Sequence, residues 1–358
     1  MLGNRSNTIG RGRKSILRHD KGNHTLNDMG EAGIIQQIQG QGTTGPASHV
    51  TKGIGDDCAV LEADGASALL VTTDTLIEGI HFTNQTLSPE ALGWKSLAVN
   101  VSDIAAMGGT PRTAFLSLGL KPETEAAFLD AFLVGFRAFS EKTGVVLAGG
   151  DTVESPSCTV VTVTLLGDCP RECVVYRSGA EVGDHIWVTG RLGDAAGGLF
   201  LLSNKARPTP VEYPSLILAH QKPMPPFELG KALGAGGLAH AMIDVSDGVA
   251  KDLGHICEQS GVGALLQGAS LPMSDPLKRL ADQVAQSPLR WALQGGEDYE
   301  LLFTASPVEE PRIRSLNAKA SDRRATRIGK IIEDSGIWLD APGGRSRLES
   351  PGFLHFIK

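Results

Sequence analysis

Five short segments of the sequence place aspartate in a turn flanked by glycine or other small residues. These segments are 53–59 (GIGDDCA), 72–76 (TTDTL), 100–109 (NVSDIAAMGG), 148–152 (AGGDT) and 243–248 (IDVSDG). Carboxylates are costly to gather, because like charges repel and burial disfavours the ionised form. If the turns converge in space, bound cations explain them, and carboxylate oxygens suit Mg²⁺, which usually works with phosphates. The pattern therefore predicts a magnesium site for a phosphorylated ligand.

Phosphoryl transfer is the chemistry that such a site serves. ATP is strongly anionic, and an acceptor that is itself a phosphate adds negative charge, so cations must lie between the two. The protein then aligns donor with acceptor, and an ionised phosphate nucleophile needs no dedicated base. Thr72 and Thr73 add hydroxyl oxygens beside Asp74, and Arg177 is suited to contact donor phosphates. One such aspartate alone is more often a helix cap or a turn residue, so their joint occurrence carries the prediction.

Other catalytic motifs are missing from the sequence. It contains no G-x-x-x-x-G-K-[ST] phosphate loop, no G-x-S-x-G elbow and no H-E-x-x-H zinc motif. Gly234, Gly236 and Gly237 do not follow a predicted strand, so they favour a helix end over a dinucleotide-binding turn. Nucleophilic catalysis by Ser or Cys therefore has no positive support.

The composition is typical of a globular protein with two domains. The chain has 358 residues, too many for one ordinary core, of which 41% are hydrophobic and 20% charged. Its formal net charge of −7 argues against a nucleic-acid partner. No apolar run reaches the roughly 18 residues that span a bilayer, which argues against a membrane protein. The five cysteines have no regular spacing, so we expect reduced thiols and a cytoplasmic protein.

Residues 1–28 differ from the remainder, because they are rich in Arg and Lys and poor in apolar residues. Without an apolar stretch they do not form a signal peptide, and a transit peptide has little support. We expect a disordered extension here, and Met29 offers an alternative start. Residues 40–53, rich in Gly, Thr and Pro, are expected to form a mobile loop.

The spacing of apolar residues and turn signals predicts a mixture of strands and helices. Strands are expected near 59–62, 68–73, 113–120, 145–148, 159–166, 185–189 and 264–266, and helices near 31–38, 88–107, 123–143, 195–204 and 249–259. Ser88 and Pro89 form a strong helix start, whereas Gly149, Gly150 and Asp151 are expected to follow a strand end. Hairpin-like neighbours rather than strict βαβ alternation predict an α+β fold.

Two faces of the predicted helix 88–107 differ in character. Leu97, Val101 and Ile104 follow helical spacing and form a core stripe. Ser96, Asn100 and Asp103 share another face, which we predict to point into a site, although a solvated helix side is the alternative.

Seven collinear segments resemble the thiamine-monophosphate kinase family, a member of the PurM-like (aminoimidazole ribonucleotide synthetase-like) superfamily. They are GIGDDCAVL, TTDTLIEGIHF, KSLAVNVSDIAAMGG, LAGGDT, RSGAEVGD, IDVSDGVAKDLGHI and WALQGGEDYELLFT. The resemblance runs from about Gly30 to the C-terminus, and so many segments in order make it highly specific. It implies transfer of the terminal phosphate of ATP onto thiamine monophosphate, which gives thiamine diphosphate and ADP.

The resemblance also implies a fold and an assembly. The fold is a two-domain PurM-like α+β fold, with an N-terminal sheet-plus-helices domain at 29–167 and a C-terminal α/β sandwich-like domain at 168–358. The N-terminal domain would carry the metal and ATP site and pair with that of a second copy into a barrel, so a homodimer is expected. ATP would lie between the domains.

Site residues follow by position within the matching segments. The implied ligands of several Mg²⁺ ions are Asp57, Thr72, Thr73, Asp74, Asp103, Asp151, Asp244 and Asp247. The implied ATP contacts are Gly150, Arg177 and Ser246, and the implied thiamine monophosphate contacts are His81, Glu297 and Phe353. The family often has Ser at the position of Thr72, and aromatic residues vary at that of Phe353.

Two other functions remain open from the sequence. One is another ATP-dependent enzyme of the superfamily, such as a cyclising synthetase or a selenophosphate synthetase. The latter uses a reactive Cys or selenocysteine in a glycine-rich loop, and residues 40–53 contain no Cys. The other is a nucleotide-binding protein of the same fold without turnover, against which the intact set of aspartates argues.

Overall fold

The structure, a computed structural model, describes residues 26–41, 49–63, 65–203, 208–319 and 324–348. Helix α1 (Leu26–Gln41) belongs to a unit of its own and is interrupted at Gly30, whose φ is 64°. It includes the helix predicted at 31–38 and also the last three residues of the extension predicted to be disordered. Residues 1–25 and 42–48 lie outside the described residues, and 42–48 make up half of the predicted loop at 40–53. In the described part of that loop the prediction is wrong at 40–41, which belong to α1, and at 50–52, which form a strand. The described residues from His49 to Leu348 form a second unit.

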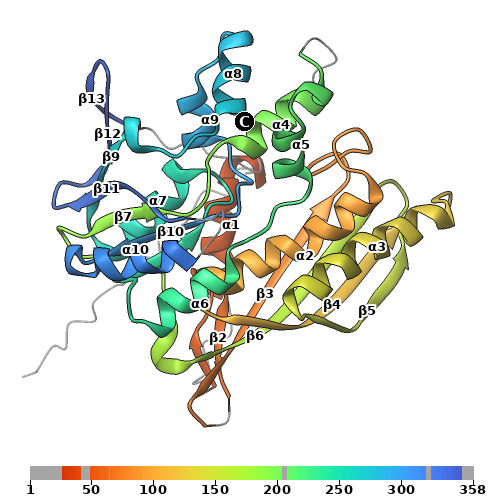
Figure 1. Ribbon diagram of the computed structural model, residues 1–358. Helices are drawn as coiled ribbons and strands as arrows, with labels where there is room; N and C mark the ends of the chain where they lie inside the picture. Colours follow the sequence, from red (N-terminus) through yellow and green to blue (C-terminus); the bar gives the residue numbers. More distant parts are fainter. Residues whose placement is uncertain (1–25, 42–48, 64, 204–207, 320–323, 349–358) are drawn as a thin grey trace, which may run out of the picture. The chain divides into compact units, whose positions relative to one another are not determined.

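A mixed sheet of six strands forms the first half of this second unit (Figure 1). In spatial order its strands are β1 (Val50–Lys52), β2 (Ala59–Glu62), β3 (Ser67–Ile77), β6 (Val160–Pro170), β4 (Thr110–Leu120) and β5 (Val146–Glu154). All neighbours are antiparallel except β4 and β5. Helices α2 (Pro89–Ala106) and α3 (Ala126–Thr143) lie along one face, and β5 forms an exposed edge.

Two predicted strand ends are wrong. Asp74 was expected just after a strand but lies inside β3, which pairs with β6 over its whole length. Asp151 was expected to follow a strand end but lies inside β5, because the parallel pairing with β4 continues beyond Gly149. Gly150 permits this continuation: a Cβ there would lie 1.7 Å from the carbonyl oxygen of Leu116. The close approach of two strands therefore overrides the turn that Gly-Gly-Asp indicates.

Helix α2 begins as its sequence predicts and packs tightly on α3. The Ser88 hydroxyl accepts a hydrogen bond from the Ala91 backbone N–H, and Pro89 occupies the first turn. Where the two helices meet, a Cβ added to Gly135 would lie only 1.8 Å from the Glu90 carbonyl oxygen. The two helix backbones therefore touch at this point.

We expect Gly135→Ala to destabilise the protein by about 2–3 kcal/mol, because the added methyl group forces the two helices apart. The urea midpoint of unfolding measures the effect. Val134→Ala is the matched control, since Val134 is 55% exposed in the same turn of helix. Equal midpoints for the two variants would contradict the close packing.

The second half of the unit contains a seven-stranded sheet. In spatial order its strands are β13 (Gly344–Arg347), β12 (Gly336–Ala341), β9 (Gly263–Gln267), β11 (Thr326–Ile332), β7 (His185–Val188), β10 (Leu301–Ala305) and β8 (Ala241–Asp244). Its helices are α4 (Asp194–Ser203), α5 (Pro214–Gln221), α6 (Phe227–Ala235), α7 (Val249–Ser260), α8 (Asp275–Gln283), α9 (Pro288–Gln294) and α10 (Glu310–Lys319). Only β9 and β12 pair in parallel among these described strands, so the predicted α+β class is confirmed.

Alternate residues of β7 divide the core of this half between the two sheet faces. Ile186 packs with Ile243 and with α7, whereas Trp187 packs with Phe303, α6 and α10. Ala105 and Ala106, at the end of α2, belong to the second of these clusters. Helix α2 therefore contributes to the cores of both halves.

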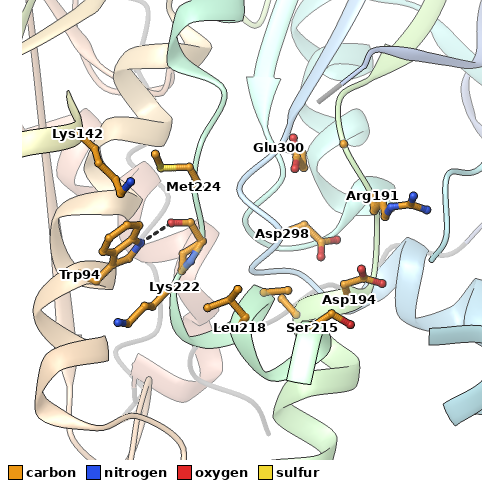
Figure 2. A pocket seen from close by; sticks show the side chains of 14 residues that line it. Trp94, Lys142, Arg191, Asp194, Ser215, Leu218, Lys222, Met224, Asp298 and Glu300 are labelled. Carbon is orange, nitrogen blue, oxygen red and sulfur yellow. Dashed lines mark hydrogen bonds between the residues drawn. The ribbon is translucent and has the colours of Figure 1, made fainter. Parts of the chain in front are cut away.

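A cavity of about 440 Å³ opens between the two halves of the unit (Figure 2). Trp94 and Lys222 lie on one side of it and Asp298 and Glu300 on the other. The indole N–H of Trp94 donates to the Pro223 carbonyl oxygen at 2.7 Å, which holds the connection between α5 and α6 against α2. Among the described residues, no helix has the length and apolar character needed to cross a membrane.

Candidate functional site

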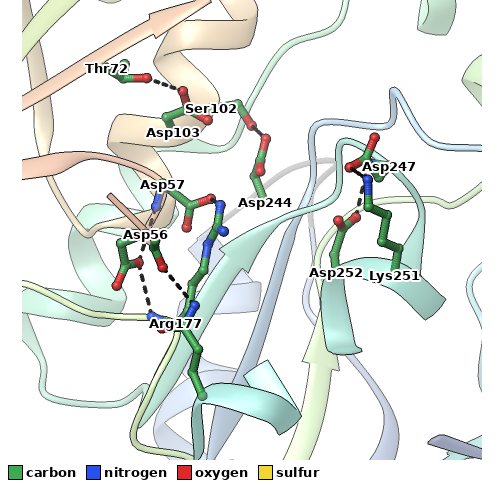
Figure 3. Close-up of polar contacts among 12 residues, drawn as sticks. Asp56, Asp57, Thr72, Ser102, Asp103, Arg177, Asp244, Asp247, Lys251 and Asp252 are labelled. Atoms are coloured by element: carbon green, nitrogen blue, oxygen red, sulfur yellow. Dashed lines mark hydrogen bonds and ion pairs between the residues drawn. The ribbon is translucent and has the colours of Figure 1, made fainter. Parts of the chain in front are cut away.

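Three aspartates from distant parts of the chain converge (Figure 3). Asp57 follows the turn after β1, Asp103 lies in the last turns of α2, and Asp244 ends β8. One carboxylate oxygen of each lies within 4.8 Å of the others. The predicted convergence of these acidic segments is therefore present in the structure.

Neighbouring side chains hold each of the three carboxylates. The Thr72 hydroxyl donates to Asp103. The Ser102 hydroxyl donates to Asp244 Oδ2 at 2.7 Å, and the Arg177 guanidinium donates to Asp57 Oδ1, also at 2.7 Å. Of the polar face predicted for α2, only Asp103 belongs to the cluster, because the side chains of Ser96 and Asn100 donate to carbonyl oxygens of their own helix. Ser102, which was not predicted, is the other residue of α2 that contacts the cluster.

Asp56, which was not predicted as a site residue, holds the backbone of Asp57 and Arg177 in place. Its Oδ1 accepts hydrogen bonds from the backbone N–H groups of Asp57 and Arg177, both at 3.2 Å. Its Oδ2 lies 3.2 Å from Lys52 Nζ, and its side chain is fully buried. The second Asp of the GDD turn therefore faces the site while the first anchors the turn.

Burial and mutual repulsion raise the pKa values of the clustered carboxyl groups. Burial, with a smaller contribution from Asp57, raises the pKa of Asp74 to about 6, although a hydrogen bond with Asp103 opposes the change. Burial and the charge of Asp57 raise the pKa of Asp244 to about 8. Burial and then the charges of Asp74 and Asp244 raise the pKa of Asp103 well above its usual value. The neighbouring Arg177 therefore does not offset the cost of ionising all of these carboxyl groups together.

Without metal, we expect the free energy of unfolding to fall as pH rises from about 4 to about 8. A carboxyl group whose pKa is raised in the native state binds protons more tightly there than in the unfolded chain, so stability is lost across the interval between the two values. For Asp74, raised from 3.8 to about 6, the loss is on the order of 3 kcal/mol. Thermal unfolding in EDTA at pH 5 and pH 8 measures it, and Mg²⁺ should raise the melting temperature more at pH 8. A melting temperature in EDTA that rises over this range would contradict the charge balance inferred for the cluster.

The cluster fits a hard divalent cation. Asp57 Oδ2 is buried and has no hydrogen-bond partner, which leaves a desolvated oxygen beside the carboxylates of Asp103 and Asp244. Three carboxylates with a nearby hydroxyl are the donor set that Mg²⁺ prefers. A bound cation would supply the missing positive charge.

Three of the predicted ligands lie outside this cluster. The Thr73 hydroxyl bonds to that of Thr164 at 3.1 Å, on the opposite face of β3 from the buried Thr72. Asp247 pairs with Lys251 Nζ at 2.6 Å. Asp151 is exposed on the edge strand β5. This strand is the third from β3 in the sheet, after β6 and β4.

The separation of Asp151 follows from the strand register. Asp151 pairs with Ser117, Ser117 with Thr162, and Thr162 with Thr75. Three strand spacings amount to roughly 14 Å. Gly150, the predicted ATP contact beside it, lies at the same edge. Within one chain the structure therefore does not bring the Gly150–Asp151 pair to the aspartate cluster.

The other predicted ligand contacts have partners of their own. His81 Nδ1 accepts a hydrogen bond from the Ile77 backbone N–H at 3.0 Å, in the turn after β3. Glu297 pairs with Lys95 Nζ at 2.6 Å, and its backbone N–H donates to the Ser246 carbonyl oxygen at 2.7 Å. Phe353 lies outside the described residues.

The loop that carries Ser246 is held by another residue that the sequence analysis missed. Asp252 Oδ2 accepts hydrogen bonds from the backbone N–H groups of Asp247 and Gly248, at 3.3 and 3.0 Å. Asp252 is buried in the first turn of α7. An acidic residue four positions after Gly248, at a helix start, was the available signal.

The chain is similar to proteins of a known family over most of its length. Family models match residues 55–169 (AIR synthase related protein, N-terminal domain) and 181–340 (AIR synthase related protein, C-terminal domain). The thiamine-monophosphate kinase of Aquifex aeolicus is 34% identical, over 92% of this chain and 99% of the relative. That of Escherichia coli K12 is 39% identical, over 86% of this chain and 92% of the relative. The chain belongs to the thiamine-monophosphate kinase family.

Solved structures agree with this membership. The structure of AaThiL complexed with AMPPCP and TMP matches with a TM-score of 0.80 and 33% identity, over 93% of this chain and 99% of that chain. The thiamine-monophosphate kinase of Stenotrophomonas maltophilia K279a matches with a TM-score of 0.71 and 39% identity, over 86% of this chain and 94% of that chain. The predicted family and the two-domain PurM-like fold are therefore confirmed.

Proposed function

We propose that this member of the thiamine-monophosphate kinase family transfers the terminal phosphoryl group of ATP to thiamine monophosphate, the last step of thiamine diphosphate formation. The observation that carries the proposal is the convergence of Asp57, Asp103 and Asp244 in a chain whose relatives are thiamine-monophosphate kinases. A solved relative is complexed with AMPPCP and TMP, which fits an ATP donor and this acceptor. The reaction is direct phosphoryl transfer between two anions.

Several Mg²⁺ ions are part of the proposal. Asp57, Asp74, Asp103 and Asp244 would hold them, with Thr72 as a hydroxyl donor, and Thr73, Asp151 and Asp247 complete the proposed ligand set. The ions would neutralise the reacting phosphates and polarise the transferred group. The chain's own part is to hold these carboxyl groups close together, where a bound cation favours their ionised form, and to keep Arg177 beside Asp57, from which its charge would face donor phosphates.

The proposed ligand contacts divide between donor and acceptor. Gly150, Arg177 and Ser246 would contact ATP, and His81, Glu297 and Phe353 would contact thiamine monophosphate. The proposed domains are 29–167 and 168–358, and the family models over 55–169 and 181–340 support a division between two domains in this region. The ATP site would then lie between the domains.

A homodimer is also proposed. The edge strand β5 is exposed at all nine residues, and Val146, Leu147 and Val153 are exposed apolar residues on it. An uncovered apolar edge strand is a liability that proteins normally cover. A second copy pairing there would cover it and bring Asp151 to a neighbouring acidic cluster, which one chain alone does not do.

A cytoplasmic location completes the proposal. All five cysteines are free thiols, which fits a reducing compartment that also supplies ATP.

The test is an assay of the purified protein with ATP, Mg²⁺ and thiamine monophosphate. We expect thiamine diphosphate and ADP in equal amounts, and neither product when Mg²⁺ is removed with EDTA. Free phosphate released without thiamine diphosphate would instead indicate an ATP-dependent synthetase of the same fold. ATP binding without turnover would indicate a non-catalytic nucleotide-binding protein.

A further inference from the structure

A buried ionic network joins three segments beside the cavity. Lys95 on α2 is 1% exposed, and its Nζ lies 2.6 Å from Glu297 Oε1. His220 on α5 is fully buried, and its Nδ1 lies 3.2 Å from Glu297 Oε2. Each oxygen of the Glu297 carboxylate therefore faces one nitrogen, from α2 and from α5, although the imidazole is not aligned for a hydrogen bond.

The charge states of the network follow from its surroundings. Burial, with a contribution from Lys95, lowers the pKa of His220, so the imidazole is neutral near pH 7. Burial would raise the pKa of Glu297, but the Lys95 charge and the contact with His220 outweigh it and hold this pKa below its usual range. Lys95 and Glu297 thus form an ionised pair, with His220 as a neutral partner.

A buried ion pair of this kind contributes little to the free energy of unfolding. Removing two charges from water costs about as much as their attraction returns, and apolar residues of similar volume are often as stable. The Glu297 side chain nevertheless remains 26% exposed while both partners are buried. Lys95 and His220 fix the Glu297 carboxylate on two sides, and its third side is accessible to a ligand.

The backbone around Glu297 is strained and clamped. Glu297 and Tyr299 adopt positive φ values of 59° and 49°, which residues with side chains seldom adopt. Backbone N–H groups of Glu297 and Tyr299 donate to the carbonyl oxygens of Ser246 and Val245, at 2.7 and 2.9 Å. The turn is therefore attached directly to the segment that follows Asp244.

The network lies between the cavity and the aspartate cluster. Trp94, Ala219 and Asp298 line the cavity, and each is the chain neighbour of a network residue. On the other side, Lys95 Nζ lies 6.0 Å from the centre of the Tyr299 ring. The backbone N–H of Tyr299 donates to the carbonyl oxygen of Val245, the residue after Asp244, which places Tyr299 beside the cluster. A substitution in the network would therefore displace residues that line the cavity.

We propose that Lys95 and His220 are positioning residues that hold the Glu297 carboxylate in place to bind the cationic organic part of the acceptor. This inference rests on the proposed function, in which Glu297 contacts thiamine monophosphate. Lys95 balances the formal charge of Glu297, but the exposed side of the carboxylate still presents its oxygens to the thiazolium end of that molecule. The network therefore orients the acceptor with its phosphate toward the aspartates. ATP has no such cationic part, so its binding does not depend on the network.

Paired variants of His220 test the proposal. His220→Asn keeps an N–H donor near the position of Nδ1, whereas His220→Leu removes it at similar size. We expect His220→Leu to raise the KM for thiamine monophosphate about 10-fold, with the KM for ATP changed less than about 2-fold, and His220→Asn to restore most of the loss. Lys95→Met should act in the same direction as His220→Leu, and Lys278→Met, in an exposed pair on α8, is the matched control.

The outcomes separate this inference from the proposed function. Formation of thiamine diphosphate by the wild-type enzyme tests the function, and the ratios of variant to wild-type KM values test the network. If the wild-type enzyme is active but His220→Leu changes the KM values for ATP and acceptor equally, or changes neither, the positioning role is overturned. Equal acceptor KM values for His220→Asn and His220→Leu, with only lower melting temperatures, would show a purely structural role. A wild-type enzyme that forms no thiamine diphosphate overturns the function and the inference together.

Discussion

Asp103→Asn is expected to lower kcat for thiamine diphosphate formation by about 10³-fold, which corresponds to about 4 kcal/mol of transition-state stabilisation. Asp103 is a member of the cluster, since one of its carboxylate oxygens lies within 4.8 Å of those of Asp57 and Asp244, and it also accepts a hydrogen bond from the Thr72 hydroxyl. Asn keeps the shape and the acceptor for the Thr72 hydroxyl but removes the negative charge. Cation binding and charge neutralisation at the reacting phosphates are therefore lost together.

The same substitution should stabilise the metal-free protein. Burial and the neighbouring carboxylates make the ionised form of Asp103 unfavourable and raise its pKa, and a neutral amide avoids that cost. We expect a higher melting temperature than wild type in EDTA at pH 8, and little further increase when Mg²⁺ is added. Loss of activity with gain of stability is the signature of a residue selected for function.

Asp168→Asn is the matched control for this prediction. Asp168 pairs with Arg112 on the exposed part of β6 and β4, far in sequence from the cluster-forming turns. Exposed ion pairs contribute little, so both kcat and the melting temperature should stay close to wild type. A kcat for Asp103→Asn within about 10-fold of wild type at saturating Mg²⁺ would remove Asp103 from the proposed ligand set.

Local signals in the sequence predicted much of the fold. Ser88 and Pro89 mark the start of α2, and the stripe of Leu97, Val101 and Ile104 is fully buried in the first core. A helix cap and an apolar stripe each involve residues within a few helical turns, so both can be recognised in the sequence without knowledge of the remaining chain. Strands β11, β12 and β13 were not predicted. The partners of β11, which are β7 and β9, lie far away in the sequence, whereas β12 and β13 form a local hairpin whose signal was missed.

The site was predicted in part, for the same physical reason. Asp57, Asp103 and Asp244 were identified because each lies in a small-residue segment whose composition already points to a metal. Lys95 and His220 were missed, because a buried lysine and a buried histidine signal a function only once their shared partner is known. Glu297 lies 202 positions from Lys95 and 77 from His220, and pairing over such separations has no local signal.

The position of Asp151 requires a test that distinguishes one chain from two. Asp151 lies on the exposed edge strand β5, three strands from β3, whereas Asp103 lies in the cluster. If a second copy covers that edge, each complete site combines the cluster of one chain with Asp151 of the other. Asp103→Asn and Asp151→Asn should then each inactivate both sites of their own homodimer while leaving the fold intact.

A heterodimer of these two inactive variants should regain activity. One of its sites contains both substitutions, and the other contains neither, because it combines the intact cluster of the Asp151→Asn chain with the intact edge of the Asp103→Asn chain. We expect a heterodimer purified through two different tags to show about half of the wild-type kcat per dimer. Direct measurement of thiamine diphosphate formation by this purified species gives the result.

A second heterodimer supplies the control. Asp57→Asn combined with Asp103→Asn places one substitution in each cluster, because both residues come from the same chain's site, so this heterodimer should remain inactive. Activity in the first heterodimer but not in the second assigns Asp151 to the neighbouring copy. Inactivity of both would instead place Asp151 in the site of its own chain, which requires β5 to move toward β3. Full activity of the Asp151→Asn homodimer would remove Asp151 from catalysis altogether, leaving the aspartates of the cluster to hold the cations alone.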